Sequence, residues 1–169
     1  MQMVRNAIIL LILFPLVVMF FMPKKELYYL LEKQLEAQNI VISDEVLTEG
    51  PLSLRIEHPV LYFSGVPLAT AKQITLWSLL FYTKADFEDL VIAEGLAGEV
   101  SVGALTAIHA LPAPLKVRIN GESSLGALEG HVFLRERRLY LDVPKGGQNK
   151  MLSKYLKKGE KGWYYESKF

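Results

Sequence analysis

The sequence predicts a mainly β protein, a curved antiparallel sheet in the form of a half-sandwich or an open groove, with an N-terminal membrane helix and flanking short helices. Three observations carry this prediction. An uninterrupted apolar run lies near the N-terminus, a hydrophobic period of two dominates residues 40–143, and glycine recurs through the alternating segments. We therefore divide the chain into an anchor (1–25), an amphipathic helix (26–39) and a β-rich domain (40–169).

The composition excludes several classes of protein. The chain has no cysteine, which excludes disulfide frameworks, thiolate metal sites and cysteine nucleophiles. Its formal net charge is +1, whereas a general nucleic-acid binder needs a basic surplus to neutralise phosphates. Because 51% of its 169 residues are hydrophobic, the chain can bury apolar surface and is not expected to be disordered.

Residues 7–22 (AIILLILFPLVVMFFM) contain no charge and are mostly large and apolar. As a helix this run extends over about 24 Å, so flanking residues are expected to complete a span of about 30 Å. A cleaved signal peptide is the alternative, but residues 20–23 (FFMP) occupy the place of a small-residue cleavage site. The predicted anchor residues are Ala7, Ile8, Ile9, Leu10, Leu11, Ile12, Leu13, Phe14, Leu16, Val17, Val18, Phe20 and Phe21.

The charges around this run are nearly balanced, with Arg5 on one side and Lys24 and Lys25 on the other. A short tail before a first apolar segment favours a cytoplasmic N-terminus. The next segment predicts an amphipathic helix, because leucines at 27, 30, 31 and 35 recur at helical spacing and Asn39 ends the run. Pro23 stands where a first-turn proline would.

Alternation predicts half-buried strands from residue 40 onward, including 52–57, 60–62 and 73–76. Turn residues separate the strands at 49–51, 64–65, 94–95, 120–121 and 144–147, which favours an antiparallel meander. Residues 76–82 (LWSLLFY) break the alternation and are expected to form a short helix or loop that plugs an end of the sheet. Residues 84–93 predict another strand, whose first half stays open between helix and strand.

A second series of strands is punctuated by glycine. Isolated glycines in strands mark bulges or a strongly bent sheet, so we expect this sheet to curl around its apolar face. The curl can enclose a packed core or remain an open groove. The predicted strands are 99–102, 115–119, 125–128, 131–134 and 139–143, and the glycines are Gly98, Gly103, Gly121, Gly126 and Gly130.

The C-terminal segment is basic. Residues 148–158 (QNKMLSKYLKK) predict an amphipathic helix that Gly159 ends, and residues 163–169 predict a last strand. Residues 145–169 hold seven lysines and two acidic groups, whereas residues 26–99 hold four basic and twelve acidic groups. The lysines are expected to form a solvated face, to pair with the acidic half of the chain, or to contact anionic headgroups.

The sequence contains no catalytic signature. His58, His109 and His131 lack metal-ligand spacing, and the nucleophile-elbow and phosphate-loop motifs are absent. The densest acidic cluster, Asp86, Glu88 and Asp89, is more typical of a solvated strand end than of a cation site. We predict no catalytic, cofactor-binding or metal-binding residue and no cofactor. The chain is expected to be a scaffold, an adaptor or a lipid-binding module rather than an enzyme.

Four segments together carry a resemblance to a known family: residues 22–43 (MPKKELYYLLEKQLEAQNIVIS), 50–76 (GPLSLRIEHPVLYFSGVPLATAKQITL), 111–144 (LPAPLKVRINGESSLGALEGHVFLRERRLYLDVP) and 149–169 (NKMLSKYLKKGEKGWYYESKF). They resemble the type II secretion system protein N (GspN) family and its AsmA-like relatives. The resemblance implies a single-pass bacterial inner-membrane protein, accessory to secretion, with most of the chain in the periplasm. It implies no active-site residue.

Two functions follow as hypotheses. In the first, the chain is an adaptor of type II secretion that docks on other inner-membrane subunits through an exposed strand edge. In the second, the sheet binds or transfers lipid, as in AsmA-like and LptC-like proteins. The expected partners are therefore the bilayer, secretion subunits and, in the second hypothesis, a lipid, but not nucleic acid. The residues expected to line a lipid groove are Leu54, Ile56, Tyr62, Ile74, Leu76, Val117, Ile119, Val132, Leu134 and Leu141.

Overall fold

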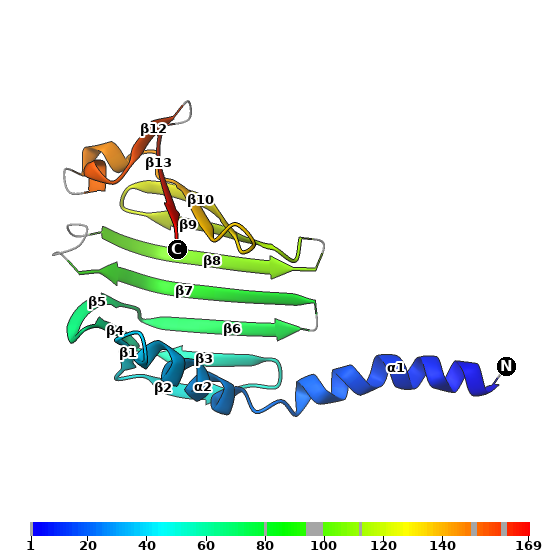
Figure 1. The fold of residues 1–169 in the computed structure, drawn as a ribbon. Coiled ribbons are helices and arrows are strands. Elements are labelled where there is room, and N and C mark those ends of the chain that lie inside the picture. Colours follow the sequence, from blue (N-terminus) through cyan, green and yellow to red (C-terminus); the bar gives the residue numbers. More distant parts are fainter. Residues whose placement is uncertain (1, 80, 94–99, 112, 150–151, 160–161) are drawn as a thin grey trace.

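The computed structural model describes residues 2–79, 81–93, 100–111, 113–149, 152–159 and 162–169. Their main feature is one curved antiparallel sheet of 13 strands, which does not close on itself. Two α-helices precede the sheet: α1 (Gln2–Phe20) projects away from it, and α2 (Lys24–Glu36) lies against one end (Figure 1). The predicted fold class is confirmed.

The strands follow one another mostly as hairpins. From β6 to β11 each strand pairs with the next. The last residues of β7 also pair with β5, which continues through β4 to β1 as a short branch of the sheet. The strands are β1 (Ile40–Ser43), β2 (Val46–Glu49), β3 (Ser53–Glu57), β4 (Val60–Phe63), β5 (Val66–Thr70), β6 (Gln73–Leu79), β7 (Tyr82–Ile92), β8 (Val100–Ala110), β9 (Lys116–Ser123), β10 (Gly126–Phe133), β11 (Arg138–Asp142), β12 (Lys157–Gly159) and β13 (Gly162–Lys168).

Side-chain alternation explains why these segments form strands. In β3, Leu54 and Ile56 are buried while Arg55 between them is exposed, as a period of two requires. Helix α2 covers this end of the sheet, because Tyr28 packs against Leu54 and Ile56 in one buried cluster. Pro23 is the N-cap of α2 rather than its first helical residue, and the backbone N–H of Lys24 donates to Glu49 Oε1 at 2.8 Å.

Glycine permits the curvature at two points inside strands. A Cβ atom at Gly130 of β10 would lie 2.6 Å from the carbonyl oxygen of Tyr140, and one at Gly121 of β9 would lie 2.7 Å from that of Ala104. The neighbouring strands thus approach these positions too closely for any side chain. Gly103 lies at a register shift between β8 and β9, so the expected glycine bulge is also present.

Several predicted boundaries are wrong, in each case because strand pairing extends further than local sequence signals suggested. Residues 76–79 continue β6 instead of forming a plug, and β7 is a strand throughout. The predicted turn at residues 120–121 lies within β9, and the strands predicted at 125–128 and 131–134 are one strand, β10. The turn expected at residues 94–95, with Gly98 and Glu99, lies outside the described residues.

The helix predicted over residues 148–158 is also wrong for the residues that the structure describes. Two short 3-10 helices, η1 (Gly146–Gln148) and η2 (Leu152–Lys154), precede β12 there. Leu156 packs against the second core cluster, formed by Val102, Leu128 and Val143. This segment therefore covers the end of the sheet opposite to α2 (Figure 1).

Candidate functional site

One face of the sheet carries three rows of mainly apolar side chains that cross the strands. Residues directly opposite each other on antiparallel strands project to the same face, so the register defines each row. The central row is Leu54, Leu76, Ala85, Ala107, Ile119, Gly130, Leu141 and Tyr165; the second is Ile56, Ile74, Phe87, Leu105, Gly121 and Leu128; the third is Ser78, Thr83, His109, Val117, Val132, Leu139 and Ser167. We call these rows the apolar face.

Helix α2 covers one end of the apolar face, and the C-terminal segment that contains Leu156 covers the other end. At one end Tyr28 of α2 seals Leu54 and Ile56, and at the other Leu156 packs near Val102 and Leu128. Between these ends Phe87 is only half-buried, and Leu105 is half-buried at the edge of the cluster that contains Val102 and Leu128. Among the described residues, no side chain is less than 2% exposed. Val100 and Val102 of the middle strand β8 are buried, at 5% and 3% exposed, whereas Ala85 and Phe87 of β7 are only partly covered.

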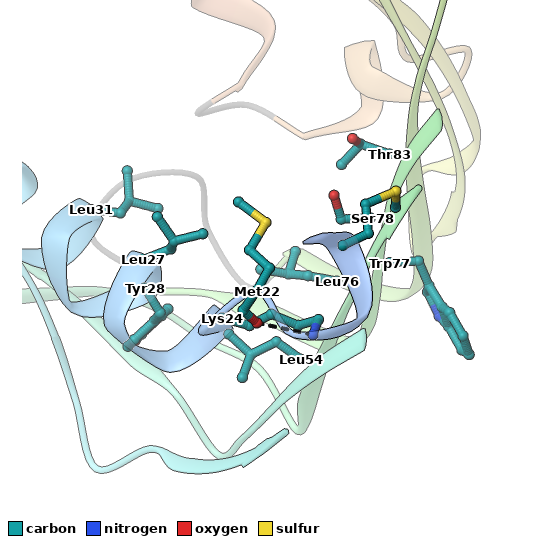
Figure 2. A pocket seen from close by; sticks show the side chains of 11 residues that line it. Met22, Lys24, Leu27, Tyr28, Leu31, Leu54, Leu76, Trp77, Ser78 and Thr83 are labelled. Atoms are coloured by element: carbon teal, nitrogen blue, oxygen red, sulfur yellow. Dashed lines mark hydrogen bonds between the residues drawn. The ribbon is translucent and has the colours of Figure 1, made fainter. Parts of the chain in front are cut away.

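A hollow of about 230 Å³ lies at the α2 end, and we call it the α2 hollow. Leu27 and Leu31 of α2 lie on one side, Ser78 and Thr83 of the sheet on the other, and Met22 between them (Figure 2). Met19, near the end of α1, also contributes to its lining. The apolar face thus begins beside the end of the projecting helix.

A second hollow, of about 390 Å³, lies beneath the C-terminal segment, and we call it the far hollow. Its lining is almost entirely apolar and comes from β7 to β11, β13 and the segment around η2. The lining residues are Ile92, Val100, Val102, Ser123, Leu125, Leu128, Leu139, Leu141, Val143, Leu152, Tyr155, Leu156 and Tyr165. The two hollows therefore lie at the two ends of the apolar face.

The structure brings eight of the ten predicted groove residues onto this face. Leu54, Leu76, Ile119 and Leu141 belong to the central row, Ile56 and Ile74 to the second, and Val117 and Val132 to the third. Tyr62 stands apart in β4, opposite Val41, while its neighbour Leu61 is opposite Ile42, which packs on the α2-end core. Leu134 follows the end of β10 and is 44% exposed.

Sequence reasoning missed the middle of the face. Phe87 lies in the segment left open between helix and strand, and Leu105 and Ala107 lie beyond the predicted end of their strand. The available signal was the alternation of Ala85 and Phe87 with charged residues. The hollows were also missed, because residues remote in sequence line them.

Burial at the α2 end affects the titration of Tyr28. Its hydroxyl donates to Glu45 Oε1 at 3.2 Å, and its side chain is only 5% exposed. Burial, reinforced by the negative charge of Glu45, raises the pKa of Tyr28 above its ordinary value. Tyr28 therefore stays protonated and serves as a packing and hydrogen-bonding residue.

Two of the three carboxylates in the acidic cluster of β7, Asp86 and Asp89, pair with lysines. Asp86 Oδ1 accepts from the Thr106 hydroxyl at 2.7 Å, and Asp86 Oδ2 lies 2.8 Å from Lys84 Nζ. Asp89 lies 3.8 Å from Lys72 Nζ. Within the described ranges, no group of three or more histidine or acidic side chains is arranged to hold a metal ion.

Helix α1 holds the predicted anchor residues. It is the one helix in the described part of the chain that is long and apolar enough to cross a membrane, and none of its apolar window is buried against the sheet. Its 19 residues extend over about 28 Å, close to the hydrocarbon thickness. Phe21 of the predicted set lies just beyond the helix end.

Comparisons with models of known families, with curated proteins and with solved structures give no match for this chain. Its function is therefore argued from the fold and the apolar face. A long apolar surface with few hydrogen-bonding groups can hold hydrocarbon, and large exposed apolar patches mark interaction sites.

Proposed function

We propose that this protein binds the acyl chains of a membrane lipid on its apolar face, while α1 anchors it in the bacterial inner membrane with the sheet in the periplasm. The observation that carries the proposal is the central row, which crosses eight strands, with the second row beside it over six strands and the third over seven. On this proposal the protein acts by binding rather than by catalysis.

The shape of the face favours an extended hydrocarbon chain. Ala85, Ala107 and Gly130 give the central row a floor of small residues, and the larger Phe87 and Leu105 stand beside it. Seven strand spacings between β3 and β13 correspond to about 34 Å along the row. Each methylene group buried there stabilises the complex by about 0.8 kcal/mol.

The position of α1 supports a lipid rather than a protein as the occupant. Met19 and Met22, at and just after the end of α1, line the α2 hollow, so the apolar face continues directly from the anchor. A lipid leaving the bilayer at this point would stay in apolar surroundings. The polar contribution to the hollow is small, since Ser78, Thr83 and the Lys24 ammonium are its main polar groups.

Photo-crosslinking at adjacent residues of β8 tests this proposal. A photoreactive benzoylphenylalanine at Ala107 faces the central row, whereas one at Ile108 faces the opposite side, between Lys84 and Arg118. In cells labelled with radioactive fatty acid, we expect the Ala107 derivative to capture labelled lipid and the Ile108 derivative not to. Equal labelling at both positions, or none at Ala107 in a folded protein, would refute lipid binding.

A second candidate function is that of an adaptor in type II secretion, and the free strand edges favour it. In the described part of the chain, β1, β2 and β12 each pair with a single neighbour, and all three residues of β12 are exposed. Exposed edges offer backbone groups for strand addition by another subunit. Copurification in mild detergent tests this function: secretion subunits at stoichiometric amounts support it, and their absence contradicts it.

A further inference from the structure

The face of β9, β10 and β11 opposite to the apolar face carries a polar hollow of about 440 Å³. This volume lies within the range of small-molecule sites, about 300–1,000 Å³. Basic residues line one end and acidic residues the other. Because the sheet separates this polar hollow from the apolar rows, it is independent of the proposed acyl-chain site.

Two cations at the basic end have no carboxylate partner in the described part of the chain. Lys116 and Arg118 lie two residues apart on β9, and neither takes part in an ion pair. Phe133 supports Lys116, whose Nζ lies 5.4 Å from the centre of that ring. A pair of free cations on one strand is a site that favours an anion.

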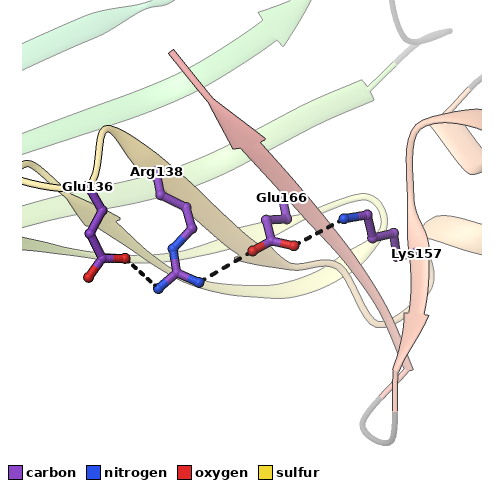
Figure 3. Close-up of polar contacts among 4 residues, drawn as sticks. All are labelled: Glu136, Arg138, Lys157 and Glu166. Carbon is purple, nitrogen blue, oxygen red and sulfur yellow. Dashed lines mark hydrogen bonds and ion pairs between the residues drawn. The ribbon is translucent and has the colours of Figure 1, made fainter.

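Nearby cations on the same face are neutralised, which sets Lys116 and Arg118 apart. Arg138 lies 2.9 Å from Glu136 and 3.3 Å from Glu166, and Lys157 lies 3.1 Å from Glu166 (Figure 3). These four residues form a linear series of alternating charges, Glu136–Arg138–Glu166–Lys157. Arg138 and Lys157 are therefore already neutralised, whereas Lys116 and Arg118 in the polar hollow are not neutralised by any described residue.

His131 adds a third donor to the basic end. It lies directly opposite Arg118, and its Nδ1 is buried without a hydrogen-bond partner. Because a buried N–H without an acceptor is rarer and costlier than a buried nitrogen acceptor without a donor, we assign the proton of the neutral ring to Nε2. Burial lowers the pKa of His131, as do Lys116 and Arg118, against opposing effects of Asp142 and Glu129. A neutral imidazole with its proton on Nε2 is a hydrogen-bond donor.

The other end of the polar hollow suits hydroxyl groups. Glu129 lies opposite Asn120 on β9 and opposite Asp142 on β11, and the Tyr140 hydroxyl donates to Asp142 Oδ1 at 2.8 Å. Carboxylates accept hydrogen bonds from ligand hydroxyls, and they repel a second anionic group. The arrangement thus discriminates between the two ends of a ligand.

We propose that the polar hollow binds a phosphorylated polyol, with its phosphate against Lys116, Arg118 and His131 and its hydroxyls toward Glu129, Asn120 and Asp142. The polyol phosphate is either a free sugar phosphate or the headgroup of a lipid such as phosphatidylglycerol, which share this chemistry. Inorganic phosphate has only the anionic half of the ligand, and glucose only the hydroxyl half.

NMR of the histidine-labelled full chain in phosphatidylcholine nanodiscs tests this site, with His131→Gln assigning the signal. We expect glucose 6-phosphate to raise the pKa of His131, because a bound anion stabilises the imidazolium. The charged and titratable groups that face His131 are Lys116 and Arg118 on β9, Tyr140 and Asp142 on β11, and Glu129 on its own strand. Inorganic phosphate should bind at least about tenfold more weakly, and glucose should cause no shift. Nanodiscs containing phosphatidylglycerol form the second arm, and a shift in that arm alone identifies a lipid headgroup as the source.

Arg118→Gln should weaken binding at least about tenfold, whereas Arg135→Gln, at the exposed hairpin after β10, should leave it unchanged. The proposal is overturned if neither glucose 6-phosphate nor phosphatidylglycerol shifts the His131 signal, or if Arg118→Gln responds as the unaltered chain does. It is also overturned if inorganic phosphate binds as tightly as glucose 6-phosphate. Photo-crosslinking at Ala107 is unaffected by any of these results, so the two proposals fail separately.

Discussion

Gly130 and Gly103 show how differently two strand glycines contribute to this sheet. A side chain at Gly130 would meet the backbone of β11, with the Tyr140 carbonyl oxygen 2.6 Å and Leu141 Cδ1 2.8 Å from its Cβ. A side chain at Gly103 would meet no atom within 4 Å. Only Gly130 is therefore required by close approach of neighbouring strands.

We predict that Gly130→Ala destabilises the sheet by about 1–3 kcal/mol, the usual cost of overpacking. Gly103→Ala is the matched control, because it removes the same freedom from the unfolded chain and is expected to be neutral or slightly stabilising. Urea unfolding of both variants in mild detergent measures the difference. Equal midpoints for the two variants would contradict the role assigned to Gly130.

Glu166 links β13 to both neighbouring strands by accepting from Lys157 of β12 and Arg138 of β11 (Figure 3). Hydrogen bonding from Lys157, followed by that from Arg138, holds the pKa of Glu166 below its ordinary value. A carboxylate with a depressed folded pKa stabilises the fold above its unfolded pKa. This contribution is lost as the pH falls through the folded value.

Glu166→Gln is accordingly expected to lower the urea midpoint at pH 7, with a gap to the unaltered chain that closes as the pH falls below about 4. Glu136→Gln is the control, since Glu136 contacts Arg138 alone and is 57% exposed. It should change the midpoint less at every pH. A Glu166→Gln gap that stays constant between pH 7 and pH 3 would argue against the ion pairs as its cause.

At the scale of elements, the sequence predicted strands better than it predicted their limits. Alternation in β3 is complete within the segment, so it could be read without knowing its partners. The limits of β9 and β10 depend on pairing along their whole length, which carries the chain through Gly121 and Gly130 without a break. The helical stripe over residues 148–158 was misleading, because Lys157 and Lys158 pair with β13 instead.

Helix α1 provides the prediction that belongs to this scale. Leu11 and Phe14 lie near the middle of its 19 residues and are 75% and 66% exposed. Replacing both with arginine should release the chain from membranes under alkaline carbonate, since each charge costs about 2.5–3.5 kcal/mol at a helix centre. Leu30→Arg in α2, also exposed, should leave the chain in the membrane pellet. Retention of the double variant would exclude α1 as the anchor.

At the scale of the whole molecule, the apolar face exists only because eight strands share one register. Alternation predicted eight of its residues, yet their common row could not be predicted, because row membership depends on which strand lies beside which. The sequence also shows that acidic residues concentrate in residues 26–99 and lysines in residues 145–169. In the described residues, however, Lys157 pairs with Glu166 of its own segment and not with the acidic half of the chain.

Filling the floor of the central row tests the face as a unit. We expect Ala85→Phe with Ala107→Phe to reduce the lipid that copurifies with the full chain by at least about fivefold, because the two rings would occupy the space of a hydrocarbon chain. Ile108→Phe places a ring on the opposite side of β8 and should not change the lipid content. Unchanged lipid in a folded double variant would mean that the chains lie elsewhere.

The meander from β6 to β11 also bears on how the chain reaches this state. Each of these strands pairs with the one that follows it, so no crossover connection separates paired strands in this part of the sheet. The sheet can then grow by one hairpin at a time, with each new strand aligned on its predecessor. A slip of one residue between β6 and β7 would turn every side chain added later to the wrong side. The first hairpin of the meander thus fixes the orientation of all the strands that follow.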